Sequence, residues 1–461
     1  MKKWIVLTCI VTGSVAFTGI LQTGNNYDPV PVPASPQRTG GDPEEGFKYL
    51  TTGDYVKGGI PYNVFIMGVG KDRRNFLERS GKNEKVGYGY TVITAANGEL
   101  LVAPNCLQCH AQEFEGELII GLGNSLIDFT HNEKLNLNNL RMVESMLKLT
   151  ARNKYEAAKH FIDVTKTVGP YLSTAVQGVN TADRLAAILA AHRDPVTFQW
   201  IDSAQLNIPA EVIPSDTPPW WLLRKKNAMF YNGFGRGDFG RFLMASNLLT
   251  VNDTTESKVV DSHMPDVLAY INALRPPAYP KEINIAEALK GEKIFNDNCS
   301  KCHGTYGTNE SYPNLLIPQA VIQTDSFLYK SNYSNPQFIN WFNKSWFTQG
   351  DHPARLEPFE GYIAPPLDGI WITAPYLHNG SVPTLEALLN SDLRPKYWSR
   401  NFINPKYDYE KAGWQYKAHD APGRKTIYNT ELPGYGNYGH YFGDKLSADE
   451  RKALIEYLKT L

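Results

Sequence analysis

The sequence lacks an excess of charge of either sign. Its 461 residues include 46 Lys and Arg and 47 Asp and Glu, which gives a formal net charge of -1. Proteins that bind nucleic acid present a basic surface to the phosphates. The balanced charge therefore argues against nucleic acid as a partner. A chain of 461 residues also exceeds what one hydrophobic core usually supports, so we expect two or more domains.

Long apolar runs are scarce as well. The one clear run, residues 4–20, follows Met-Lys-Lys, and a basic start before an apolar stretch is typical of an export signal. No clear small-residue cleavage site follows, so residues 1–21 are predicted to be a signal peptide or an N-terminal anchor. Residues 22–45, rich in Pro and Gly, are predicted to be a flexible linker. We expect the body of the protein to be periplasmic or extracellular.

Cysteine is rare, and its placement is informative. Apart from Cys9 in the apolar run, the cysteines form two Cys-x-x-Cys pairs, each followed at once by histidine. Two thiols at this spacing can each form a thioether to a haem vinyl group, and the adjacent histidine then binds the iron. Zinc sites and disulfides are the alternatives for such pairs. The residues predicted to hold two covalent haem c groups are Cys106, Cys109 and His110, and Cys299, Cys302 and His303.

Methionine is absent after His303, because Met264 is the last of the seven in the chain. Soluble electron carriers usually bind the second face of the iron with a downstream methionine. The second haem therefore needs another ligand, and the histidine candidates are His352, His378, His419 and His440. The first haem has more candidates, or an open position: Met142, Met146, Met229, Met244, Met264, His131, His160, His192 and His263.

Proline marks a domain boundary near residue 275. Apolar residues at helical spacing predict a helix over residues 265–274, and Arg275-Pro-Pro ends it. A second helix is predicted to lead into Cys299. The third, at the C-terminus, carries Ser447 and Glu450 in the pattern of a capping box. We predict a mainly α fold of two cytochrome c-like haem domains with long loop insertions, residues 46–275 and 276–461.

Residues 364–385, APPLDGIWITAPYLHNGSVPTL, resemble the signature of the dihaem cytochrome c peroxidase superfamily. The Asp-Gly-Ile-Trp version resembles the branch that includes the dihaem rubber oxygenase. Weaker resemblances lie in residues 117–124, 218–221, 235–239 and 436–440. The resemblance covers roughly residues 45–461, and its motifs indicate a family and not a substrate.

The resemblance implies a role for several residues. In the oxygenase branch a histidine near the chain end is the second ligand of the C-terminal haem, which maps onto His440. The peroxidases use a methionine at the position of Asp392, so their ligation is absent here. The N-terminal haem of this branch is the reactive one, and Trp220, Trp221 and Phe230 are predicted to line its distal face. For His378 we favour a supporting role beside the second haem over ligation.

These observations predict a dihaem oxidoreductase of oxygenase or peroxidase type. The first haem would activate dioxygen or peroxide, and the second would relay electrons. The expected partners are a redox protein or an organic small molecule. The alternatives are a dihaem electron-transfer protein without catalysis and a haem-bearing scaffold. Whether a calcium ion lies between the domains is left open by the sequence.

Overall fold

The computed structural model describes residues 27–130 and 137–461. The predicted signal or anchor, residues 1–21, and the ligand candidate His131 lie outside the described residues. The structure is 40% helical and 14% strand, with several small sheets. The prediction of a mainly α fold is therefore wrong, and the fold is mixed α/β. The strands escaped prediction because none is longer than five residues, too short for a clear alternating pattern.

The helices vary from one turn to about five turns. They are α1 (Pro43–Thr52), α2 (Tyr62–Val69), α3 (Leu107–His110), α4 (Leu137–Thr150), α5 (Arg152–Val168), α6 (Ala182–Ala191), α7 (Phe239–Leu243), α8 (Thr254–Ser262), α9 (Met264–Ala273), α10 (Ile285–Asn298), α11 (Ser300–His303), α12 (Gln319–Ile322), α13 (Phe327–Ser334), α14 (Pro336–Asn343), α15 (Leu385–Leu389) and α16 (Ala448–Leu458).

The strands form small antiparallel sheets, some of which pair neighbouring segments while others join segments that lie far apart in the chain. They are β1 (Val30–Pro31) with β8 (Leu315–Pro318) and β10 (Gly361–Ile363); β2 (Ile60–Pro61) with β4 (Leu100–Pro104) and β3 (Tyr90–Thr94); β5 (Ala111–Phe114) with β6 (Glu117–Ile120); β7 (Gly235–Gly237) with β9 (Ala354–Leu356); β14 (Lys417–His419) with β11 (Tyr397–Ser399) and β15 (Ile427–Asn429); and β12 (Tyr407–Asp408) with β13 (Gly413–Trp414).

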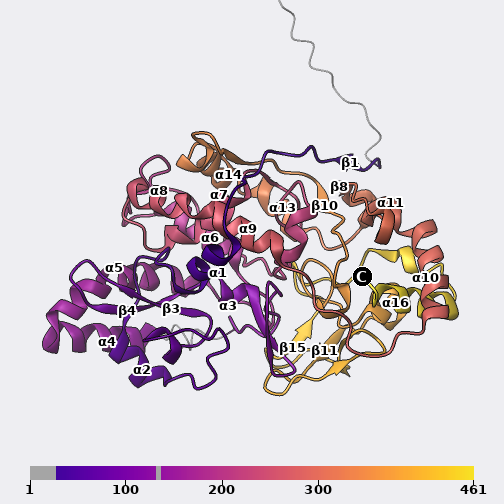
Figure 1. Cartoon of the computed structure of the whole chain (residues 1–461), viewed down its shortest axis with the longest axis horizontal. Helices are drawn as coiled ribbons and strands as arrows, with labels where there is room; N and C mark the ends of the chain where they lie inside the picture. Colours follow the sequence, from indigo (N-terminus) through magenta and orange to yellow (C-terminus); the bar gives the residue numbers. More distant parts are fainter. Residues whose placement is uncertain (1–26, 131–136) are drawn as a thin grey trace, which may run out of the picture.

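Two pairs of helices cross at close range, α1 on α9 and α10 on α16 (Figure 1). A Cβ atom on Gly46 of α1 would lie 2.0 Å from the carbonyl oxygen of Asp266, and one on Gly291 of α10 would lie 2.0 Å from that of Ala453. Only glycine permits such an approach. The same crossing thus occurs before and after the 274–284 connection. This repetition fits a degenerate duplication of one unit.

The helices that the sequence predicted are confirmed at α9, α10 and α16. In α9, Val267, Leu268 and Ile271 are buried, as their spacing indicated. The N-terminus of α16 has the predicted capping box, in which the Glu450 amide donates to Ser447 Oγ over 3.2 Å. Helix α1 was missed because it begins inside the Pro/Gly-rich segment that we expected to be a linker.

The larger hydrophobic core contains residues from both sides of the predicted boundary at residue 275. It gathers side chains from Leu50 to Ile271, and it also includes Ile339, Trp341, Phe347 and Leu356 from the C-terminal half. A second core joins α10, α15 and α16 to Trp221 and Phe114 of the N-terminal half. The two halves are therefore interlocked, although their helix pairs are separate.

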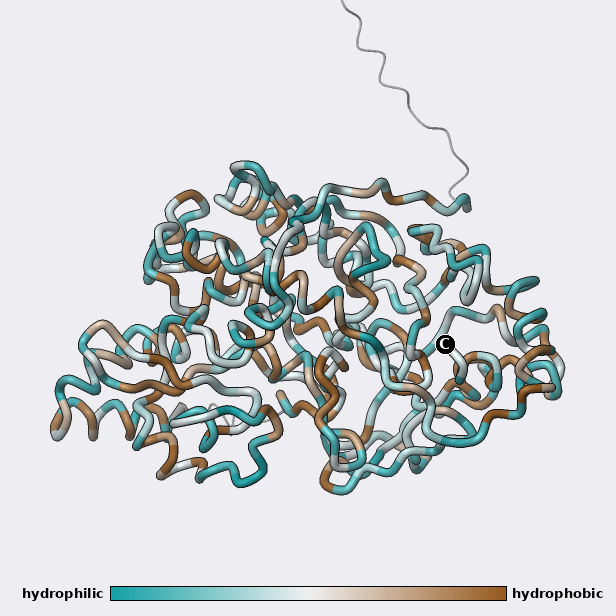
Figure 2. Tube along the Cα trace, in the orientation of Figure 1, coloured by the Kyte–Doolittle hydropathy of each residue, from teal (hydrophilic) through white to brown (hydrophobic). Residues whose placement is uncertain are grey.

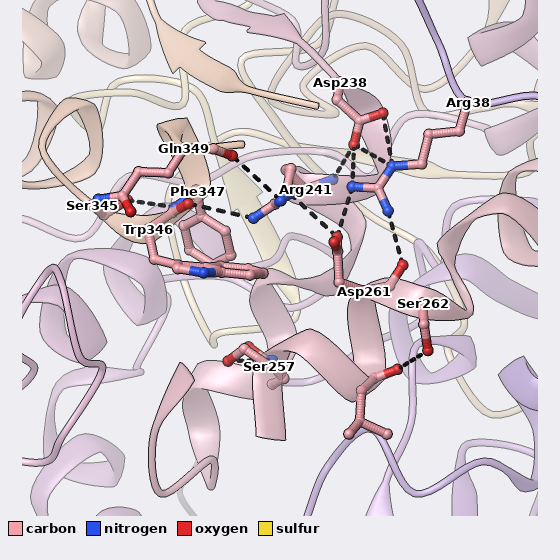
Figure 3. Close-up of polar contacts among 12 residues, drawn as sticks. Arg38, Asp238, Arg241, Ser257, Asp261, Ser262, Ser345, Trp346, Phe347 and Gln349 are labelled. Carbon is pink, nitrogen blue, oxygen red and sulfur yellow. Dashed lines mark hydrogen bonds and ion pairs between the residues drawn. The ribbon is translucent and has the colours of Figure 1, made fainter. Parts of the chain in front are cut away.

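Residues 27–42, which precede α1, lie along the body of the molecule (Figure 1). Strand β1 pairs with β8, and Arg38 lies in a buried polar cluster (Figure 3). Its guanidinium pairs with Asp238 at 2.9 Å and with Asp261 at 2.6 Å. Asp238 also caps α7 by accepting from the Arg241 amide over 2.9 Å. Part of the predicted linker, from Tyr27 onward, thus has fixed contacts.

Apolar and polar residues are interspersed along most of the chain trace (Figure 2). Among the described residues, no helix combines the length and the hydropathy required to cross a bilayer.

Candidate functional site

The second Cys-x-x-Cys-His motif forms a single helical turn directly after α10. The His303 amide donates to the Cys299 carbonyl over 3.0 Å, which closes the turn and brings both cysteines and the histidine to one side. Both thiols are free and partly exposed. Cys299 and Cys302 could attach a haem covalently from this turn, and His303 could bind its iron.

The ring of His303 is oriented by the signature segment. Its Nδ1 lies 2.8 Å from the carbonyl oxygen of Pro365, so Nδ1 carries the proton and donates to this oxygen. The tautomer leaves the lone pair of Nε2 for a metal. A hydrogen bond of this kind normally holds a metal-binding histidine in position.

The ring of His440 lies near that of His303, with the ring centroids 6.2 Å apart and the ring planes tilted by 58°. Two metal–imidazole bonds of about 2.0–2.1 Å would hold the nitrogens roughly 4 Å apart. The distance from each nitrogen to the centroid of its ring adds to this value. The sum is close to the observed distance between the two ring centroids. Nδ1 of His440 is buried and has no hydrogen-bond partner. The separation of the centroids is therefore the one expected of two imidazoles that would hold a single iron.

Burial keeps both rings in the form that a metal binds. It lowers the pKa of His440 to about 3, with a further contribution from the neighbouring His303. Burial also lowers the pKa of His303. Both imidazoles are neutral at physiological pH, and a neutral imidazole is the ligand form.

The other histidine candidates for this iron have different contacts. Nε2 of His378 lies 3.2 Å from the Tyr362 hydroxyl, and the two rings stack with centroids 4.2 Å apart. His419 Nε2 lies 2.7 Å from Ser399 Oγ. His352 is exposed. These contacts agree with a supporting role for His378, which stays a prediction.

The first Cys-x-x-Cys-His motif forms the same kind of turn after β4. The His110 amide donates to the Cys106 carbonyl over 3.0 Å. The Cys106 amide donates to the Tyr55 hydroxyl over 3.1 Å, and the Cys106 thiol lies within hydrogen-bond reach of Tyr55 and Ser246. Both thiols of this turn are free as well. A second haem c therefore fits here on the same grounds.

The surroundings of His110 differ from those of His303. Burial lowers the pKa of His110 to about 3, and its Nδ1 is buried without a hydrogen-bond partner. The Trp220 ring stacks on the imidazole, with centroids 4.5 Å apart and planes 17° apart. Among the residues that the structure describes, no histidine ring faces His110 as His440 faces His303.

The predicted distal aromatics lie in three different settings. Trp220 lies on the flat face of the His110 imidazole, whereas a metal binds in the plane of that ring, so Trp220 packs beside the ligand. Trp221 is fully buried, and its indole Nε1 donates to the Asp368 carbonyl over 2.9 Å. Phe230 is 36% exposed and packs on Phe234. A distal role for these three residues stays a prediction.

Most of the methionines and histidines that could bind the first iron pack against other side chains. Met229, Met244 and Met264 belong to the larger core, and Met142 is exposed. Three histidines have aromatic neighbours: His160 and His192 contact Trp200, and His263 stacks on Tyr49. Within residues 27–130 and 137–461, no cluster of three or more His, Cys, Asp or Glu is arranged for a metal ion.

A continuous set of contacts links the two turns. Trp220 stacks on His110, and the adjacent Trp221 donates to the Asp368 carbonyl. Asp368 lies three residues after Pro365, whose carbonyl accepts from His303. Stacking, a short stretch of backbone and two hydrogen bonds thus connect the imidazoles of the two haem motifs.

Several residues that the sequence did not predict support this site. Pro365 orients His303, and Asn379, Ser381 and Arg394 bind the backbone of the loop that carries His440. Asn379 and Ser381 lie within the recognised signature, which was the available signal. Arg394 lies outside any motif that we identified, and its contacts depend on the tertiary fold.

Comparison with known proteins gives a family match and two relatives of this chain. Residues 361–399 match the family model described as RoxA-like, cytochrome c-like. This match supports a rubber-oxygenase-like cytochrome and implies haem c, whereas the wider peroxidase superfamily stays a prediction. The uncharacterized protein y4iM of Sinorhizobium fredii is 30% identical over 299 residues, which cover 56% of this chain and 67% of that protein. The uncharacterized protein y4iJ of the same organism is 46% identical over 257 residues, and the match covers 41% of each protein.

Proposed function

Because the chain belongs to the family of y4iM and carries a RoxA-like, cytochrome c-like segment, we propose that it is an exported dihaem oxidoreductase. The unit around His110 serves the activation of dioxygen or peroxide. The unit around His303 relays electrons. Bound haem c supplies the redox chemistry, and the protein controls it through axial ligands and access.

The observation that carries this proposal is the contrast between the two turns. His303 is faced by His440, a pairing that leaves no room for an exogenous ligand. His110 is accompanied by Trp220 at its side and by no second histidine among the described residues. A saturated iron suits electron relay, and an iron with an exchangeable position suits oxygen chemistry.

The contacts between the two turns support cooperation of the two units. Trp220 and Trp221 are neighbours in the chain, and both are buried. One contacts the His110 ring and the other the backbone that leads to the His303 hydrogen bond. An electron can pass between the two motifs without crossing solvent.

The location and the partners belong to the same proposal. The basic and apolar N-terminus supports export, with the protein either released or tethered in the periplasm or outside the cell. The reaction needs an electron donor or an oxidisable organic substrate, so the partner is a redox protein or an organic molecule.

Consumption of oxidant tests the proposal. The purified holoprotein, supplied with an artificial electron donor, should consume dioxygen or hydrogen peroxide. The Cys106→Ala/Cys109→Ala variant should lose this activity, because it loses the reactive haem. If the parent protein consumes neither oxidant yet exchanges electrons with the donor, the non-catalytic electron-transfer alternative holds.

A further inference from the structure

The loop that carries His440 is fixed by side chains from the 361–399 segment. Its residues 434–440 contain no helix or strand, and His440 itself has a φ of 50°, in the left-handed region. A non-glycine residue in this region needs support from its surroundings. One main-chain bond fixes the loop at this position, because the His440 amide donates to the Ile322 carbonyl over 2.8 Å.

Arg394 supplies this support through all the donors of its guanidinium group. Nη1 donates to the carbonyls of Asn437 over 2.8 Å and Gly439 over 2.7 Å, and Nη2 donates to that of His440 over 3.3 Å. The remaining two bonds go to the end of α15, from Nη2 to Leu388 over 2.9 Å and from Nε to Ala387 over 3.1 Å. A guanidinium has five N–H groups, and five carbonyls accept from this one.

The opposite end of the loop is bound by two residues of the signature. Asn379 is fully buried, and its side-chain amide donates to the carbonyls of Gly434 and Gly436 over 2.9 Å each. Ser381 Oγ donates to the Gly436 carbonyl over 3.1 Å. Arg394 therefore holds the half of the loop that bears the histidine, and the other two residues hold the half that leads to it.

We infer that Arg394 is the positioning residue of the second haem: it sets the place of the His440 imidazole opposite His303. The inference rests on the proposed ligation of that haem by His303 and His440. Arg394 makes no ion pair with an acidic side chain in the described part of the chain, and its donors all go to backbone carbonyls. Its planar fork is what joins two chain segments at once, and a lysine cannot reproduce it.

The test is the binding of carbon monoxide to the reduced holoprotein of the full chain. Arg394→Met keeps the length of the side chain and removes every donor. Without them, His440 should leave the iron in a large share of molecules, and the protein should bind up to one more carbon monoxide per chain than the parent. The ferric low-spin signal of the second haem should decrease, and added imidazole should restore it. Arg394→Lys should show a smaller change in the same direction.

A matched control separates positioning from general destabilisation. Arg184 of α6 is buried and, like Arg394, donates to backbone carbonyls, those of Pro209 and Glu211, in the other half of the molecule. Arg184→Met should lower the unfolding temperature but leave carbon monoxide binding and the low-spin signal unchanged. If Arg394→Met does not fold, the carbon monoxide binding of Arg394→Lys decides.

The outcomes distinguish this inference from the ligation on which it rests. If His440→Ala frees the second haem while both folded Arg394 variants keep the parent's carbon monoxide binding and spectrum, Arg394 has no positioning role. If His440→Ala itself leaves the second haem six-coordinate, the proposed ligation is wrong.

Discussion

The imidazole of His303 and the imidazole of His440 lie 6.2 Å apart between ring centroids, although 137 positions separate them in the sequence. One comes from a helical turn that follows α10, and the other from a loop near the chain end. Both residues are partly buried, and desolvation lowers the pKa of each ring, so both are neutral at physiological pH. This distance between the ring centroids matches the one expected of two imidazoles that would bind the same iron.

Removal of the thiols should remove one haem at a time. Cys106→Ala/Cys109→Ala should lose the first haem, and Cys299→Ala/Cys302→Ala the second, because each thioether pair attaches one group. The pyridine haemochrome assay should give half of the parent's covalent haem per chain in either variant. Full haem content in one of them would refute the assignment of that motif.

His440→Ala should open the second haem, because His440 is the ring that faces His303. The expected result is a new high-spin signal and the binding of cyanide or imidazole at that haem. His378→Ala is the comparison, since His378 is also buried but bonds to Tyr362. If His378→Ala produces the high-spin signal and His440→Ala does not, the two roles are reversed.

A side chain at Gly46 or Gly291 should destabilise the protein, because each glycine lies where two helices cross. Gly46→Ala and Gly291→Ala each place a methyl group against a backbone carbonyl, so each should lower the free energy of unfolding by about 1–3 kcal/mol or more. Gly68 in α2 is the control, because a Cβ there meets nothing within 4 Å. Gly68→Ala should be neutral or slightly stabilising, by up to roughly 1 kcal/mol.

Urea denaturation with the haems attached measures these differences. Equal effects of Gly46→Ala and Gly68→Ala would show that α1 does not cross α9 as closely as described. Similar losses of unfolding free energy in Gly46→Ala and Gly291→Ala would support the duplication of the unit.

Stability should fall as the pH rises toward neutrality because of Asp216. Burial raises the pKa of its carboxyl to about 7, and the Tyr231 hydroxyl donates to it over 2.7 Å. In the unfolded chain the pKa of an aspartate is about 3.9. Between about pH 4 and about pH 7 the folded protein therefore keeps a proton on Asp216 that the unfolded chain releases. The free energy of unfolding therefore decreases across this window, by up to about 4 kcal/mol.

Asp216→Asn should remove this part of the pH dependence, since the amide oxygen still accepts from Tyr231. The measurement is the urea midpoint of parent and variant at the two ends of the window. Asp420→Asn, at an exposed position, serves as the control. An unchanged slope in Asp216→Asn would show that Asp216 is not the group responsible.

The sequence predicted the parts of the site whose residues lie close together in the chain. Cys299, Cys302 and His303 lie within one helical turn, so their spacing alone predicts their arrangement. The capping box of Ser447 and Glu450 is local in the same way. His440 was identified through family resemblance, because nothing local distinguishes it from His419.

The remaining features depend on contacts between distant segments. Arg394 reaches carbonyls 43 to 46 positions away, and backbone carbonyls leave no pattern in a sequence. Strand pairs such as β1 with β8 join loops that lie far apart in the chain, so the mixed α/β character was not predictable from periodicity. Helix α1 was hidden by the Pro and Gly around its start, although Pro43 at its first position is typical of a helix N-terminus.

Carbon monoxide binding to the reduced holoprotein tests the central contrast between the two haems most directly. The account predicts that the parent binds one carbon monoxide per two haems. It also predicts that the Cys106→Ala/Cys109→Ala variant binds none, because the haem it retains is closed by His303 and His440. A parent protein in which both haems stay six-coordinate and bind no carbon monoxide, or in which the remaining haem of that variant binds it, would contradict the account.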